Sequence, residues 1–198
     1  MGVQVPLGSF APLLRVTAEQ LEAMAACGAL AGLPRIELRD GVLCQVNPQY
    51  RPHLIAKSAI YDALRDALRA LGSALGVASE GSVRVGDREV PMPDVFVWDV
   101  HRGSGPAPVE HVRLVVEVSD TTLEDDLGRK RQVYAAGGVP EYWVVDLTGR
   151  VVRQYWTPGQ DSYAEEAIVP FGRQISAATL PGLGFDTTVL QDDVSAHD

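Results

Sequence analysis

Cysteine is scarce in this chain. The 198 residues include only Cys27 and Cys44, and neither lies in a CxxC or Cys/His ligand spacing. A structural zinc site or a disulfide scaffold needs several such side chains at set spacings. The sequence therefore argues against both classes.

Long apolar runs are also missing. No run approaches the roughly 20 residues that a transmembrane helix requires, and the N-terminus lacks a basic segment followed by an apolar stretch. Neither a secretory signal nor a lipid anchor is indicated. We therefore expect a cytoplasmic protein that does not enter a membrane.

The chain has no excess of positive charge, because its formal net charge is −9. Proteins that coat nucleic acid through charge alone need a strongly positive face to displace counterions. The balance speaks against that class, but it leaves room for a nuclease with a local basic patch. The hydrophobic fraction of 46% and the charged fraction of 22% are those of an ordinary soluble globular protein.

The length predicts one domain over residues 1–198, because one α/β unit of this size buries a good core. We expect a polar N-terminal arm over 1–15 and a C-terminal tail over 191–198. The sequence shows no internal repeat and no low-complexity tract.

Local signals predict the first elements. Thr17 and Gln20 fit a capping box, so a short helix should run to Cys27. Asp40-Gly41 separates two alternating runs, which is a strong signal for a type I′ hairpin.

Apolar residues at steps of three and four, from Ile60 to Leu75, predict an amphipathic helix over Ile55 to Leu75 with Gly76 as its stop. Lys57 and four other charged residues should cover its outer face. The remaining expected elements are strands over 77–85, 90–100, 113–119, 141–145, 151–156 and 163–169 and a helix from Thr121 or Thr122 to Ala136.

Three of these apolar strands carry acidic residues where a buried strand should have none: Asp94, Glu117 and Asp146. An unpaired charge in an apolar sheet costs several kcal/mol. Such charges usually converge on a cation, a partner side chain or a reaction.

Asp94 opens one strand and Glu117 lies within the next, so both carboxylates can meet at one edge of the sheet. Carboxylate oxygens suit a hard cation such as Mg²⁺ or Mn²⁺, and the carbonyl of Val118 can add a third oxygen. Such an ion polarises a phosphoryl oxygen and activates a water, and phosphodiester hydrolysis needs both effects. A nearby lysine would orient that water or stabilise the developing charge.

Pro93-Asp94 followed by Glu117-Val118 resembles the motif of the PD-(D/E)xK nuclease superfamily, although Ser119 stands where the lysine should be. Over most of its length, the sequence resembles one branch of that superfamily, the Uma-type family of restriction-endonuclease-like proteins, formerly catalogued as a domain of unknown function. The matching pieces are IELRDG, PDVFV, LVVEVS, DLGRKRQVYAAGGVPEYWVVD and LPGL. The resemblance implies a restriction-endonuclease-like α/β fold, a mixed sheet flanked by helices with an N-terminal β-hairpin and added C-terminal strands.

The resemblance also implies roles for particular residues. Asp94 and Glu117 would be the metal carboxylates, and Lys130 would be a migrated catalytic lysine. Glu37, in the IELRDG piece, would be a further acidic residue of the site. Asp126, one turn before Lys130, can also form an exposed i,i+4 ion pair.

Each of these residues also has an ordinary structural interpretation. Pro-Asp dipeptides are common in turns, Glu117 can pair with a core arginine such as Arg35, and Lys130 can belong to a solvated basic face. From the strand pattern alone, Glu37 is a solvated residue. His53, just after Pro52, is typical of a surface or capping residue.

Two tyrosines within the last long piece, Tyr134 and Tyr142, match positions that indicate packing, so we leave them out of the site. Core packing is likewise the expected role of the three tryptophans.

The favoured function is metal-dependent hydrolysis of nucleic-acid phosphodiesters, with DNA as the expected partner and a homodimer left open. The competing class is a non-catalytic nucleic-acid-binding or assembly module that keeps the nuclease fold. A hydrolase acting on a small phosphate ester is a third reading.

Overall fold

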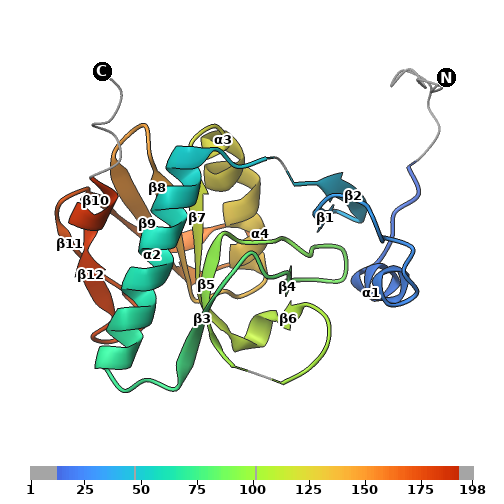
Figure 1. Cartoon of the computed structure of the whole chain (residues 1–198), viewed down its shortest axis with the longest axis horizontal. Coiled ribbons are helices and arrows are strands. Elements are labelled where there is room, and N and C mark those ends of the chain that lie inside the picture. The colour runs from blue at the N-terminus through green and yellow to red at the C-terminus, as the bar shows by residue number, and fades with distance from the viewer. Residues whose placement is uncertain (1–12, 47, 101, 192–198) are drawn as a thin grey trace.

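A six-stranded mixed sheet forms the centre of the structure, a computed structural model that describes residues 13–46, 48–100 and 102–191 (Figure 1). In spatial order its strands are β10 (Tyr163–Pro170), β9 (Val151–Pro158), β8 (Glu141–Asp146), β7 (Val112–Ser119), β5 (Val95–Asp99) and β3 (Leu75–Ser79). Only β7 and β8 pair in parallel among these strands. The sheet confirms the expected mixed α/β fold. The expected arm and tail lie outside the described residues, except for 13–15 and 191.

The β7 strand lies in the middle of this sheet, as its nearly continuous Leu/Val run predicts. Alternation directs Leu114, Val116 and Val118 into the hydrophobic cluster beneath the long helix α2 (Arg51–Ala70). Val115 points the other way, into a cluster that includes Tyr134. Glu117 shares the face of Val115, so the strand pleat presents its carboxylate to the segment that carries Lys130.

The α2 helix begins with Pro52 in its first turn and packs Ile60, Leu64 and Leu68 against the sheet. The expected range of 55–75 is wrong at both ends, because the helix begins at Arg51 and ends at Ala70. Gly72 adopts a left-handed conformation with φ 62° and stops the helix, whereas Leu75 already pairs with Asp99 as the first residue of β3.

The expected outer face of α2 is also wrong at one position. Lys57 is buried rather than solvated, because its side chain turns toward the hairpin side of the sheet and meets Gln49 and Glu80.

The predicted helix from 121 to 136 consists of three joined pieces. They are α3 (Leu123–Asp125), a π-helical turn over Asp126–Lys130 and α4 (Arg131–Ala136). A π turn inserts an extra residue into the helical ladder and is often found at functional sites. Here both of its end residues are buried.

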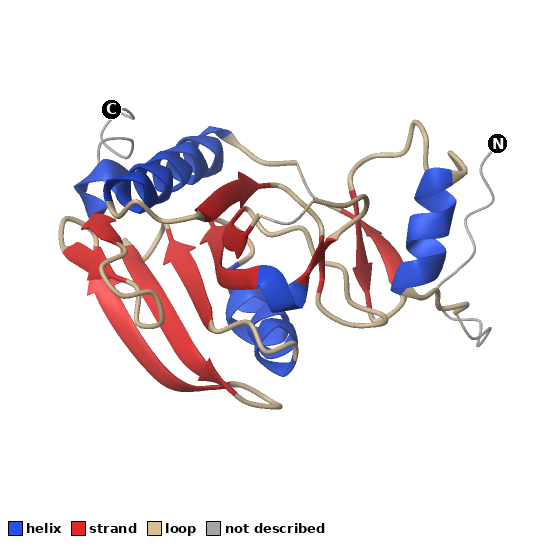
Figure 2. Ribbon diagram, turned by 90° about the horizontal axis from the view of Figure 1, so that it is seen from below, coloured by secondary structure: helices blue, strands red, loops and turns tan. Residues whose placement is uncertain are grey.

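A smaller unit lies beside the sheet, formed by α1 (Ala18–Ala26) and the hairpin of β1 (Ile36–Arg39) and β2 (Val42–Gln45) (Figure 2). The capping box of Thr17 and Gln20 is present as predicted. Asp40 and Gly41 have φ values of 46° and 75°, as a type I′ turn requires. The unit has its own core of Ala18, Leu21, Leu38 and Val90.

Short strands and 3₁₀ turns complete the fold. They are β4 (Val83–Arg84) paired with β6 (Ala107–Pro108), β11 (Gln174–Ser176) paired with β12 (Gly184–Asp186), and turns over Val109–His111 and Thr187–Leu190. Among the described residues, no helix combines the length and apolar character that crossing a bilayer requires.

Candidate active site

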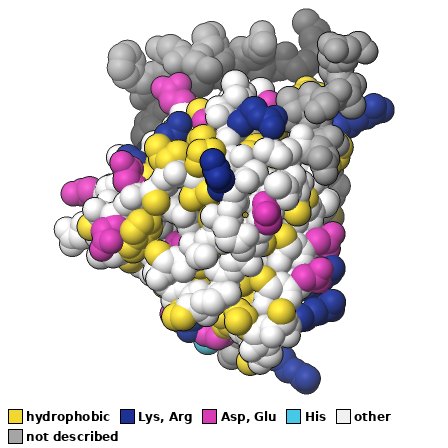
Figure 3. Space-filling view, turned by 90° about the vertical axis from the view of Figure 1, so that its left-hand side faces the viewer, with side chains coloured by type: hydrophobic (Ala, Val, Ile, Leu, Met, Phe, Trp, Pro, Cys, Tyr) yellow, Lys and Arg dark blue, Asp and Glu magenta, His cyan; other side chains and the backbone are white. Residues whose placement is uncertain are grey.

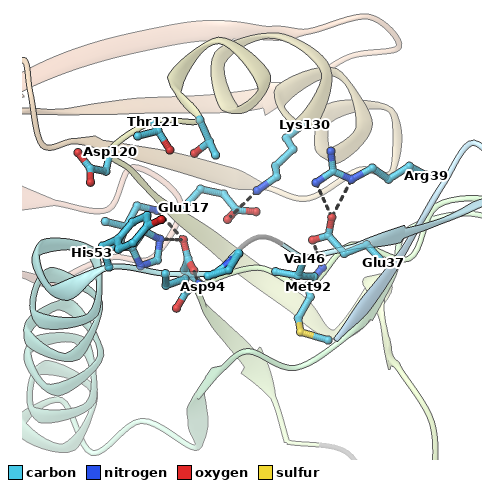
Figure 4. Close-up of a pocket in the computed structure, with 15 residues that line it drawn as sticks. Glu37, Arg39, Val46, His53, Met92, Asp94, Glu117, Asp120, Thr121 and Lys130 are labelled. Carbon is cyan, nitrogen blue, oxygen red and sulfur yellow. Dashed lines mark hydrogen bonds and ion pairs between the residues drawn. The ribbon is translucent and has the colours of Figure 1, made fainter. Parts of the chain in front are cut away.

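One small pocket brings together the acidic residues and the lysine expected to form the site. It has a volume of about 90 Å³, and its lining includes Glu37, Asp94, Glu117, Val118 and Lys130 (Figure 4). The pocket lies where the hairpin, the start of α2, the entry to β5, the end of β7 and the π turn meet. The fold thus joins segments that are up to 93 residues apart in sequence.

Asp94 lies just before β5 and is held from three directions. Its Oδ2 accepts hydrogen bonds from the Val118 backbone N–H (2.8 Å) and lies 3.1 Å from His53 Nε2. Its Oδ1 accepts a hydrogen bond from Gln49 Nε2 at 2.8 Å. Burial opposes ionisation of Asp94, but the hydrogen bond and charge of His53, the Val118 N–H and Lys130 outweigh it and lower the pKa of this carboxyl.

Glu117 has the opposite electrostatic character. Its Oε2 lies 3.1 Å from Lys130 Nζ, and its Oε1 accepts a hydrogen bond from the Tyr134 hydroxyl at 2.8 Å. Burial raises the pKa of Glu117 well above its usual value, and the charges of Asp94 and Asp126 raise it further against the opposing effect of Lys130. The pairing of Glu117 with Arg35 is ruled out, because Arg35 pairs with another residue, Glu80.

Lys130 points into this acidic cluster from the π turn. Its Nζ lies 2.9 Å from Asp126 Oδ1 as well as 3.1 Å from Glu117, and the two carboxylates raise its pKa despite burial. Arg129 instead pairs with Asp125, and Arg131 lies over an aromatic ring. The reading of Lys130 as part of a solvated basic face is therefore wrong, because the helix turns its two arginine neighbours away.

Asp126 is buried, so the exposed ion pair expected for it is wrong in its exposure, although the i,i+4 pairing with Lys130 is present. Its Oδ2 accepts hydrogen bonds from Ser119 and Thr122, each at 2.6 Å. Ser119, which occupies the lysine position of the motif, thus supports the residue that holds Lys130.

Glu37 is also buried, at 2% exposure, which overturns the solvated strand face read from the alternation. Its Oε1 accepts a hydrogen bond from the Met92 N–H at 2.9 Å, and its Oε2 lies 2.7 Å from Arg39 NH2. The hairpin folds back over the chain that precedes Asp94, and this long-range packing covers the glutamate. Glu37 therefore ties the hairpin to the approach to Asp94.

Asp146 does not join the site. Its carboxylate accepts a hydrogen bond from the Gly149 N–H (2.6 Å) and lies 3.5 Å from Arg153 NH2. This acidic residue closes the turn between β8 and β9, so the three strand acids do not converge on one point.

The sequence reasoning missed several residues that contact the cluster. His53 and Gln49 reach Asp94, Tyr134 reaches Glu117, and Tyr142 donates a hydrogen bond to the carbonyl of Asp126 at 3.0 Å. Burial and neighbouring negative charge raise the pKa values of both tyrosines well above normal, so they act as hydrogen-bond donors. The position of His53 just after Pro52, at a helix start, was the available signal.

The donor set has the chemistry that a divalent cation requires. Asp94, Glu117 and the backbone of Val118 line one pocket and offer oxygen atoms, which hard cations prefer. Burial raises the pKa of Glu117, and the charges of Asp94 and Asp126 add to the rise, so a positive ion bound here would offset both effects. Among the described residues, no group of three or more His, Cys, Asp or Glu side chains is arranged to hold a metal ion by itself. The residues therefore fit an ion completed by the Val118 carbonyl and by water.

Comparisons with known proteins identify a family for the chain and a solved structure with a similar fold. A family model described as "Uma2: Putative restriction endonuclease" matches residues 18–189. The fold is similar to that of a protein from Anabaena variabilis ATCC 29413 described as a putative nuclease belonging to DUF820, with 14% identity and a TM-score of 0.60 over 79% of this chain and 89% of that one. A comparison with curated proteins found no match.

Proposed function

Because the chain belongs to the Uma2 family of restriction-endonuclease-like proteins, we propose that it is a divalent-metal-dependent nuclease that hydrolyses phosphodiester bonds of DNA. The observation that carries this proposal is the meeting of Asp94, Glu117 and Lys130 in one pocket. Mg²⁺ or Mn²⁺ is the cation whose preference for oxygen ligands matches this set.

In this proposal Asp94, Glu117 and the Val118 carbonyl hold the cation. A bound divalent ion supplies Lewis acidity toward a phosphoryl oxygen and lowers the pKa of a water. Asp94 is suited to this role because its lowered pKa keeps it ionised. A bound cation would favour the ionised form of Glu117, because a nearby positive charge lowers the pKa of a carboxyl group.

Lys130 replaces the lysine of the motif, because Ser119 occupies that position in this sequence. Its raised pKa keeps the ammonium protonated, so it serves as a cation and hydrogen-bond donor rather than as a general base. From its place beside Glu117 it can orient the attacking water or stabilise negative charge on the phosphoryl group. Glu37, with both oxygens engaged by Met92 and Arg39, acts by holding the chain that leads to Asp94.

The distribution of charge favours local rather than extended contact with DNA. Arg39, which is one third exposed, lines the pocket and offers a cation at its mouth. On the face shown in Figure 3, the visible basic and acidic side chains are interspersed. With a net charge of −9, affinity should therefore depend on contacts near the pocket.

A non-catalytic nucleic-acid-binding or assembly module is the second candidate. One observation favours it: both oxygens of Asp94 are already engaged by protein donors. Such a hydrogen-bonded acid can serve the fold alone.

The test is a cleavage assay on single-stranded, duplex and branched DNA and on RNA, with Mg²⁺ or Mn²⁺. The proposal expects cleavage by the parent and none by Asp94→Asn or Glu117→Gln, each of which keeps the side-chain shape. Arg153→Met, which breaks an ion pair of Asp146 away from the pocket, should cleave normally. Equal cleavage by the parent and the two site variants would place any activity elsewhere, and inactivity of the parent on all substrates would favour the non-catalytic module.

A further inference from the structure

Lysine is rare in this chain, and both copies lie beside the acidic pocket. The 17 lysine and arginine residues include only two lysines, Lys57 and Lys130. In the part of the chain that the structure describes, these two are the buried basic residues, at 7% and 9% exposure. The other lysine and arginine positions are all arginines, and those that the structure describes are exposed or half-buried. The proposed function uses Lys130 and leaves Lys57 without a role.

The side chain of Lys57 reaches Asp94 through one intermediary. Lys57 Nζ donates a hydrogen bond to Gln49 Oε1 at 2.6 Å, and Gln49 Nε2 donates to Asp94 Oδ1 at 2.8 Å. The orientation of the Gln49 amide is fixed, because an ammonium cannot accept a hydrogen bond and an ionised carboxylate cannot donate one. The ammonium therefore polarises the amide whose N–H₂ binds Asp94.

A second route from Lys57 also ends at Asp94. Lys57 forms an ion pair with Glu80, whose own backbone N–H lies 3.2 Å from the Pro93 carbonyl and 3.3 Å from the Asp94 carbonyl. Glu80 holds a left-handed backbone conformation with φ 57°, which is uncommon for a residue with a side chain. Burial would raise the pKa of Glu80, but hydrogen bonds from Lys57 and Arg35 lower it, so the pair stays charged.

From these contacts we propose that Lys57 is a positioning residue of the cation site, which acts on Asp94 through Gln49 and through the backbone of Glu80. The inference rests on the proposed function, since Asp94 is there a cation ligand. Partners that orient a ligating carboxylate typically change metal affinity or activity by 10- to 100-fold when they are removed.

The rival explanation is that Lys57 only neutralises Glu80. In that case its loss would lower stability and leave the cation site unchanged. The two explanations differ in whether Lys57 senses a cation bound at Asp94.

The small number of lysines makes a direct measurement simple. Lysine-selective ¹³C,¹⁵N labelling yields two side-chain signals, and Lys57→Arg assigns them by removing one. We expect titration with MgCl₂, which is diamagnetic, to shift both signals along one saturation curve. Gln49→Leu cuts one of the two routes, so it should reduce the shift of the Lys57 signal while that of Lys130 continues to move.

Affinity for MnCl₂, measured by calorimetry, provides the second readout. Lys57→Met and Gln49→Leu should each weaken binding by about 10- to 100-fold, and the double variant should weaken it by less than the product of the two single effects, because the variants share the Gln49 route. Arg153→Met is the control for loss of an ion pair outside the pocket and should bind within about twofold of the parent. Gln49→Leu removes no charge, so it keeps the test available should Lys57→Met fail to fold.

The possible failures are distinguishable. A Lys57 signal that stays fixed while MgCl₂ saturates the shift of Lys130, or unchanged MnCl₂ affinity in Lys57→Met and Gln49→Leu, overturns the inference alone. If neither signal moves and the parent binds no MnCl₂, the proposed metal-dependent function fails and this inference fails with it.

Discussion

Replacing Lys130 with methionine removes the ammonium that lies 3.1 Å from Glu117 and 2.9 Å from Asp126. Methionine keeps the length of the side chain, so the change tests charge rather than volume. The Lys130 side chain is 11% exposed, and its partners are 2% and 1% exposed. Removing one partner of a buried ion pair costs about 3–5 kcal/mol, because the remaining charge stays buried without compensation.

The loss of folding stability in Lys130→Met should depend on pH in a defined direction. Burial, with neighbouring carboxylates, raises the folded-state pKa of Glu117, and Lys130 opposes that rise. Without Lys130 the pKa of Glu117 rises further. A carboxyl group with a raised folded-state pKa favours folding at low pH, and this contribution is lost as the pH climbs from the usual glutamate value of 4.5 through the folded-state pKa. The parent and the variant should therefore differ least at about pH 5 and most at about pH 8.

Urea unfolding of both proteins at the two pH values measures this difference. The full loss corresponds to a melting temperature lower by roughly 6–20 °C for a domain of this size. Arg129→Met is the matched control from the same helix, because Arg129 pairs with Asp125 at one third exposure. It should cost no more than about 1 kcal/mol. A loss below about 1 kcal/mol for Lys130→Met at both pH values, or a larger loss at the lower pH, would refute the electrostatic account of the cluster.

Three further outcomes are expected. Mn²⁺ at 100 times its dissociation constant should stabilise the parent by about 2.7 kcal/mol, and Glu117→Gln should reduce that gain when both are followed by thermal unfolding. Tyr134→Phe removes the hydroxyl that binds Glu117 and should cost about 1–3 kcal/mol; an unchanged free energy of unfolding would show that this hydrogen bond contributes nothing. Gly72→Ala places a side chain at φ 62° in open space and should cost about 1–2 kcal/mol without altering cleavage, so an altered cleavage rate would contradict the separation of this turn from the site.

Short-range chemistry determined much of this protein from its sequence alone. Thr17 and Gln20 cap α1, and Asp40-Gly41 forms the hairpin turn, because each signal acts within a few residues. The apolar run of β7 identified the central strand, and its one acidic residue, Glu117, marked the site. The resemblance to a known family also indicated Lys130, and the fold brings this residue into contact with Glu117.

Tertiary packing decided what the patterns could not. Leu75 continues the helical spacing of α2, yet pairing with Asp99 places it in β3. The alternation around Glu37 predicts a solvated strand residue. In the folded chain, the hairpin packs on the segment that contains Met92, and this contact buries the Glu37 carboxylate. In each case the local pattern was compatible with two structures, and a contact far away in sequence chose between them.

The support of Asp94 is likewise a product of the fold. His53, Gln49 and Lys57 each look ordinary in sequence, and the rarity of lysine was the one sequence signal that could have marked Lys57. Only the packing of α2 against the entry to β5 brings them to Asp94. The pKa of a buried carboxyl depends on every charge and donor within a few ångströms, and those neighbours come from segments that only the folded chain brings together.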